Sequence, residues 1–169
     1  MKITSGGQSG VDRAALDAAI ACGIDYGGWC PRGGWAEDFP APPGVLAKYP
    51  LLKETPRSDP AQRTEWNVRD AHAILIVVGE GGTAVSQGTA LAAELAQRYR
   101  HPTSTIDLSD PEAGARTIAW LAAQRAAFGD GFVVSIGGPR ESEAPGIYAR
   151  TLTFLRGVLP SVQSDRTMV

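Results

Sequence analysis

The feature that most constrains this chain is a threefold recurrence of an apolar run leading directly into a glycine-rich loop. The loops lie at residues 5–10, 79–83 and 137–140. A strand, a glycine loop and a helix in succession are how a parallel α/β sheet presents backbone N–H groups to an anion. Parallel strands end at one edge of their sheet, so we expect all three loops at the carboxyl edge, where open α/β sheets bind ligands.

The rest of the chain alternates strand and helix patterns. Strands are expected near residues 2–5, 24–26, 73–78, 103–107 and 132–136, and helices near 12–21, 61–70, 89–99, 111–125 and 145–158. This alternation predicts a Rossmann-like, three-layer α/β/α fold with a mainly parallel central sheet. We expect one domain over residues 1–160 and a loose carboxyl-terminal tail over 161–169.

Composition excludes several classes of protein. The net charge is −2 over 169 residues, which disfavours nucleic acid and acidic membranes as partners. No apolar run approaches the ~20 residues of a membrane span, and the amino terminus does not resemble a secretion signal. The two cysteines, Cys22 and Cys30, lack the spacing of a zinc site. We therefore expect a cytoplasmic protein with reduced thiols and no bound metal.

A long stretch at residues 27–44 is rich in glycine, proline and tryptophan. Irregular segments of this length inside a compact domain are usually functional or disordered. Because Trp29 and Trp35 disfavour disorder, we predict an ordered, ligand-facing lid. Residues 49–54 should follow as a short edge strand or turn.

The first glycine loop, Gly6-Gly7-Gln8-Ser9-Gly10, matches neither standard nucleotide motif: no lysine follows Gly10, and the glycine spacing differs from the dinucleotide fingerprint. Its glycines would allow close backbone approach, and Gln8 and Ser9 can donate to phosphate-type oxygens. The next residues, Asp12 and Arg13, are open to two interpretations. Each could serve a ligand, or Asp12 could cap the helix while Arg13 pairs with an acid.

The other loops and the lid supply further candidates. Arg140 is the cation that we place most readily at the site. Thr83 is either a ligand donor or a helix cap, and Ser86 or Thr89 could act similarly if the helix begins later. Cys30 is a possible nucleophile or soft ligand, or else a structural thiol. Three acids are available for acid–base work, but their spacing marks no pair: Glu37, Asp38 and Glu94. Three polar residues share one helix face, which is more often simply solvated: Arg63, Asn67 and Asp70.

Ordered motifs at residues 5–17, 27–33, 36–38, 49–51, 63–70 and 81–83 together resemble one known family. From about residue 3 to at least 140, the chain resembles the molybdenum carrier proteins, which are related to the YpsA-like branch of the SLOG superfamily. The resemblance implies a Rossmann-like homo-oligomer, a tetramer or dimer, that binds the molybdenum cofactor, a phosphorylated molybdopterin, with molybdoenzymes as partners. With the loops, it gives this predicted cofactor-binding set: Gly6, Gly7, Gln8, Ser9, Gly10, Arg13, Cys30, Pro31, Arg32, Asp38, Arg63, Asn67, Gly82, Thr83, Ser86, Gly137, Gly138 and Arg140.

Three functions follow from this set. The leading one is a non-catalytic binding protein for a small anionic, phosphorylated ligand, the molybdenum cofactor or a nucleotide-like molecule. The second is a phosphoribohydrolase of the "lonely guy" type, acting on nucleoside monophosphates. The loop at 79–83 lacks the proline of those enzymes, and no glutamate follows three residues after Thr83. The third is a nucleotide-sensing module, which the charge balance favours least.

Overall fold

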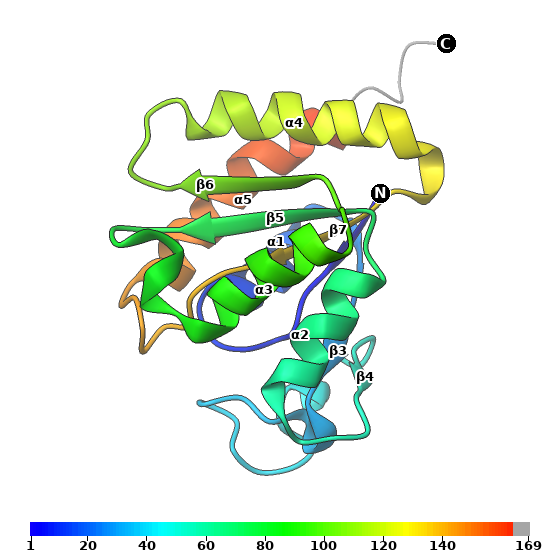
Figure 1. Cartoon of the computed structure of the whole chain (residues 1–169), viewed down its shortest axis with the longest axis vertical. Coiled ribbons are helices and arrows are strands. Elements are labelled where there is room, and N and C mark those ends of the chain that lie inside the picture. Colours follow the sequence, from blue (N-terminus) through cyan, green and yellow to red (C-terminus); the bar gives the residue numbers. More distant parts are fainter. Residues whose placement is uncertain (164–169) are drawn as a thin grey trace.

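A computed structural model describes residues 1–163 of the chain (Figure 1). A five-stranded, all-parallel sheet forms its centre, in the order β2-β1-β7-β5-β6. The strands are β1 (Lys2–Thr4), β2 (Asp25–Gly27), β5 (Ala73–Val78), β6 (Thr103–Asp107) and β7 (Val133–Gly137). Together with the helices on both faces, this confirms the predicted Rossmann-like α/β/α fold.

The helices are α1 (Val11–Ala21), α2 (Pro60–Arg69), α3 (Gln87–Arg98), α4 (Ala113–Phe128) and α5 (Ile147–Gln163). Helices α1, α4 and α5 cover one face of the sheet, and α2 and α3 cover the other (Figure 1). Strand β5 shows why both faces are covered. Its apolar side chains alternate, with Leu75 and Val77 packing under the first layer, and Ile74 and Ile76 under the second.

The lid is more regular than its sequence suggests. Two-residue strands, β3 (Trp29–Cys30) and β4 (Lys53–Glu54), pair in parallel as a separate small sheet. Beneath them, a small apolar core buries Cys30, Val45, Tyr49 and Leu52 against Leu16 of α1. The expected strand near residues 49–54 is therefore present as β4, but it pairs with the lid rather than with the central sheet.

Among the helix boundaries that differ from the prediction, two have a clear physical reason. Helix α3 begins at Gln87, after a 3-10 turn at Gly82–Val85, because Ser86 supplies the capping oxygen to Thr89 N. Helix α5 continues to Gln163, past Pro160 and past the expected domain limit at residue 160. The buried side chains of Leu159 and Val162 keep that turn helical, since core packing outweighs local propensity. The remaining residues of the expected tail, 164–169, lie outside the described residues.

Within residues 1–163, no helix has the length and apolar content to cross a membrane.

Candidate functional site

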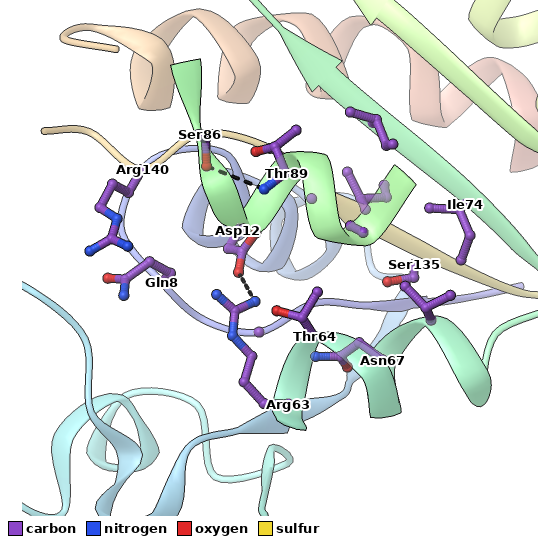
Figure 2. Close-up of a pocket in the computed structure, with 18 of the residues that line it drawn as sticks. Gln8, Asp12, Arg63, Thr64, Asn67, Ile74, Ser86, Thr89, Ser135 and Arg140 are labelled. Atoms are coloured by element: carbon purple, nitrogen blue, oxygen red, sulfur yellow. Dashed lines mark hydrogen bonds and ion pairs between the residues drawn. The ribbon is translucent and has the colours of Figure 1, made fainter. Parts of the chain in front are cut away.

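A polar cavity lies at the carboxyl edge of the sheet, between α2, α3 and the loops that follow β1 and β7 (Figure 2). Its volume is about 50 Å³. Eight of the residues predicted from sequence line it: Gly6, Gln8, Arg63, Asn67, Ser86, Gly137, Gly138 and Arg140. The lining also includes residues that were not in the predicted set, the polar ones being Asp12, Thr64, Thr89, Ser135 and Glu143. The first and third glycine loops thus meet at one site, as expected.

A buried ion pair forms one wall of the cavity. Arg63 Nη1 donates to Asp12 Oδ2 at 2.9 Å, and the backbone N–H of Gln8 also donates to this carboxylate. Burial raises the pKa of Asp12, although the Arg63 guanidinium opposes this shift. The pair also explains the glycine at position 6, because a Cβ there would lie 2.1 Å from Arg63 Nη1.

The beginning of α3 forms a second wall. Ser86 caps the helix, its side chain accepting from Thr89 N at 3.2 Å (Figure 2). The Thr89 hydroxyl oxygen is buried and has no hydrogen-bond partner among the described residues. A helix amino terminus offers unpaired N–H groups and a partial positive charge. This wall therefore presents donors without a protein acceptor.

Arg140 lies at one end of the cavity together with Gln8, whereas Ile74 and Ser135 lie at the other end (Figure 2). The guanidinium of Arg140 is 3.4 Å from the Glu143 carboxylate and 3.9 Å from the Glu37 carboxylate, and the Arg140 side chain is 34% exposed. Its position depends on Gly138, where a Cβ would lie 2.2 Å from the carbonyl oxygen of Val77. The predicted cation thus reaches the site because its loop packs directly on strand β5.

Glu37 fastens the lid to both glycine loops. Its carboxylate accepts from the hydroxyl groups of Ser9 and Ser142 and from Ser142 N, and its own N–H donates to Gln8 Oε1 at 2.9 Å. Partial burial works against ionisation, but the hydrogen bonds from Ser142 and Ser9 hold the pKa of Glu37 below its ordinary value. The lid, the loop after β1 and the loop after β7 are therefore linked through this one side chain.

A second group of predicted residues faces a separate depression. Its lining includes Ser9, Gly10, Arg13 and Asp38. Arg13 donates to both Asp38 carboxylate oxygens, at 2.9 and 3.0 Å, and to the carbonyl oxygen of Gly7. Of the two interpretations offered for Arg13, pairing with an acid is the one that the structure shows.

The remaining predicted residues also lie away from the cavity. Cys30 is fully buried in the lid core, and burial raises its pKa to about 11. Pro31 and Arg32 follow it, and Arg32 lines a different groove. Gly82 and Thr83 form the 3-10 turn before α3 and do not line the cavity.

Asn67, which lines the cavity, also anchors the lid. Its side-chain amide accepts from the N–H of Trp29 and donates to the carbonyl oxygen of Trp29.

The residues missing from the predicted set gave weak sequence signals. Asp12 and Arg13 are neighbours on one helix turn, and only the fold shows that Asp12 points inward, where it meets a residue 51 positions away. From the sequence, Thr89 is only an alternative to Thr83, because the glycine run at 79–83 is the more obvious cradle, and Gly88 is not singled out. The Ser86-to-Thr89 spacing of a helix cap was the signal that could have located them.

A comparison with protein-family models places the chain. The circularly permutated YpsA SLOG family model matches residues 3–159. The chain belongs to this family. Among solved structures, it is similar to a protein from Syntrophus aciditrophicus SB named "putative molybdenum carrier protein". The two chains are 38% identical, the match covers 94% of each, and the TM-score is 0.79. No curated protein matches the sequence. The resemblance to the molybdenum carrier and YpsA-related proteins is confirmed.

Proposed function

We propose that this SLOG protein binds a small ligand by seating a phosphate-type oxyanion in the cavity described above, without turning it over. The observation that carries the proposal is the convergence of Arg140, Arg63 and the unpartnered Thr89 hydroxyl at the beginning of α3. Guanidinium groups and helix amino termini are the two protein features best suited to a tetrahedral oxyanion. The proposed anion-binding set follows from the cavity lining: Gly6, Gln8, Arg63, Ser86, Thr89, Gly137, Gly138 and Arg140.

The cavity volume limits what can enter. About 50 Å³ holds on the order of three to five water molecules, if each requires roughly 10–15 Å³. That is room for a phosphoryl group and not for a whole nucleotide or pterin. A larger ligand would therefore insert its phosphate and leave its remaining part beyond the rim at Arg140 and Gln8.

Charge balance sets the conditions for binding. The two arginines of the cavity are offset by the carboxylates of Asp12 and Glu143, so an incoming dianion must displace or neutralise a carboxylate. Arg140 is the easier of the two to release, because its contacts with acids are longer and its side chain is partly exposed. We infer that it turns from Glu143 and Glu37 towards the ligand.

We further propose the molybdenum cofactor as the ligand, following the resemblance and the name of the Syntrophus protein. The residues fit its phosphate group, which the set above would hold. Within residues 1–163, no group of three His, Cys, Asp or Glu side chains could hold a metal ion. In this proposal molybdenum arrives within the cofactor, which supplies the metal's redox chemistry to its recipient. Delivery to molybdoenzymes and assembly into a dimer or tetramer are parts of the same proposal.

A second candidate is hydrolysis of a nucleoside monophosphate, because a buried carboxylate, Asp12, faces the cavity. This carboxylate already accepts hydrogen bonds from Arg63 and from the Gln8 backbone, which favours binding over catalysis. The other acids are also engaged, since Asp38 pairs with Arg13 and Glu94 with Arg98 on an exposed face. Release of free base from a nucleotide panel, lost in Asp12→Asn, would overturn the non-catalytic part of the proposal.

Calorimetric titration with purified molybdenum cofactor tests the proposal. We expect saturable binding that weakens about tenfold or more in Arg140→Ala, because a charge-assisted hydrogen bond contributes about 1.5–3 kcal/mol. The matched control is Arg98→Ala, which removes an exposed arginine that pairs with Glu94 four residues earlier on α3. Equal affinity in wild type and Arg140→Ala, or no binding at micromolar cofactor, would contradict the proposal.

A further inference from the structure

A second hollow lies beside the anion cavity, within the lid. We call it the Trp35 groove. It is lined by Trp35, Pro40, Pro42 and Pro60, with Arg32 and Ser58 at polar positions, and its volume is about 380 Å³. That volume and apolar lining lie within the range of small-molecule sites. None of the apolar residues that form it belongs to the set proposed above for the oxyanion.

Trp35 differs from the other three tryptophans of the chain. Trp29 donates to Asp70 and packs edge-on against Trp66, which Arg69 also covers. Trp120 packs against the main core. Within the described part of the chain, neither a hydrogen bond nor a ring contact engages the Trp35 indole. A large ring that faces a groove without a partner is available to stack on a ligand.

The groove is built on a rigid base. A Cβ at Gly34 would lie 2.2 Å from the carbonyl oxygen of Pro43, and a Cβ at Gly44 would lie 2.0 Å from that of Gly34. The two 3-10 turns of the lid, at Arg32–Gly34 and Gly44–Ala47, therefore touch backbone to backbone, which only glycine permits. Proline rings, which have no soft backbone φ, form much of the remaining wall. A preformed wall lowers the entropy cost of holding a flat ligand.

Two connections join the groove to the anion cavity. Pro60 of the groove and Thr64 of the cavity are four residues apart on α2, hence on one side of the helix and about 6 Å apart along its axis. The chain also passes from Trp35 to Glu37, whose N–H bonds Gln8 of the cavity. The groove thus lies where a ligand anchored by its phosphate would place its remaining part.

We propose that the Trp35 groove is the ring subsite of the same ligand, and that it selects a flat heteroaromatic ring joined to a phosphate through a short linker. A purine nucleotide and a pterin phosphate share this chemistry. Stacking on Trp35 between proline walls holds the ring, and Arg32 and Ser58 offer hydrogen bonds to its edge. This inference rests on the proposed function, because a phosphate seated in the anion cavity determines where the ring of the ligand lies. Binding of a ring to the groove can nevertheless be tested without a phosphate.

The first experiment probes the ring alone. Guanosine, which carries no phosphate, is titrated into ¹⁵N-labelled protein, and the four indole N–H signals are followed by NMR. We expect the Trp35 signal, assigned from the Trp35→Phe variant, to shift in a saturable manner while the Trp66 signal stays in place. Absence of a Trp35 shift up to the solubility limit of guanosine would overturn the inference, whatever the phosphate does.

The second experiment joins the two subsites by calorimetry, comparing guanosine monophosphate with ribose 5-phosphate. We expect the nucleotide to bind about tenfold tighter, the contribution of a stacked base. Trp35→Leu should abolish this preference and leave ribose 5-phosphate binding unchanged, Trp35→Phe should keep most of it, and the control Trp66→Leu should keep all of it. A preference that survives Trp35→Leu in folded protein would refute the ring subsite. Failure of ribose 5-phosphate to bind, with a normal guanosine shift, would instead refute the phosphate cavity.

Discussion

Replacing Arg63 with methionine tests the buried ion pair on which the cavity depends. The substitution keeps the apolar stem of the side chain and removes only the guanidinium. The two side chains are 15% and 5% exposed, so the Asp12 carboxylate would remain buried without its cation. Breaking a buried pair in this way costs about 3–5 kcal/mol. We expect about 3 kcal/mol at neutral pH, because the Gln8 N–H still bonds the carboxylate.

The cost should depend on pH in a definite direction. Burial raises the pKa of Asp12, and loss of Arg63 raises it further. A carboxyl whose pKa is higher in the folded state than in the unfolded state contributes stability that is complete below its unfolded pKa. That contribution is lost as pH rises through the folded pKa. The destabilisation of Arg63→Met should therefore grow from acidic to neutral pH, by up to about 1.4 kcal/mol per pH unit for one proton.

Urea unfolding of wild type and Arg63→Met between pH 5 and 8 measures this difference. Adding Asp12→Asn to Arg63→Met removes the buried charge and should recover much of the lost stability and abolish its pH dependence. The matched control is Arg98→Met, whose exposed pair with Glu94 contributes about 0.3–0.5 kcal/mol. A loss below about 1 kcal/mol in Arg63→Met, or a loss that does not change with pH, would refute the reasoning.

Three further predictions follow from the glycines, the lid and the thiols. Gly138→Ala should destabilise the protein by about 1–3 kcal/mol in thermal unfolding, because the new Cβ would lie 2.2 Å from a β5 carbonyl oxygen. The control Gly157→Ala, which lies in open space on α5, should stabilise the protein slightly. Equal effects of the two substitutions would be contrary to the structure. Glu37→Gln should reduce the free energy of unfolding at neutral pH. The difference from wild type should shrink as pH falls through the lowered pKa of Glu37, because the wild-type carboxylate then becomes protonated. A difference in urea titrations that does not change with pH would argue against this. Iodoacetamide at pH 7 should modify the half-buried Cys22 before Cys30, which is fully buried with its pKa raised to about 11; mass spectrometry showing the reverse order would mean that the lid opens readily.

The central sheet could be predicted because its signals are local. The apolar runs of β5 and β7 and their glycine loops define strands that end at one edge, and this edge carries the cavity. The lid sheet could not be predicted in the same way. Its strands have two residues each, and they are separated by more than 20 positions in the sequence. They are brought together by the packing of the small apolar core around Tyr49, which only the folded chain forms. No periodicity exists in so short a run.

The site was predictable in its loops and not in its partners. Arg140 and Gln8 could be predicted because they lie in the glycine-rich loops that follow apolar runs. The inward position of Asp12 could not, because it depends on which face of α1 packs inward and on the ion pair with Arg63 of α2. For the second cradle, the sequence favours Gly82 and Thr83, with Ser86 or Thr89 as the alternative if the helix begins later. In the structure, the Ser86 cap moves the cavity to Thr89.

Anomalous diffraction from crystals soaked in molybdate, grown without sulfate or phosphate, tests the central claim most directly. Molybdate is a tetrahedral oxyanion like phosphate, and its metal gives a strong anomalous signal that distinguishes it from sulfate and phosphate. The proposed function predicts a molybdenum peak inside the cavity, with oxygens within hydrogen-bond distance of the Thr89 hydroxyl and the Arg140 guanidinium. An empty cavity alongside peaks at surface arginines alone would contradict it.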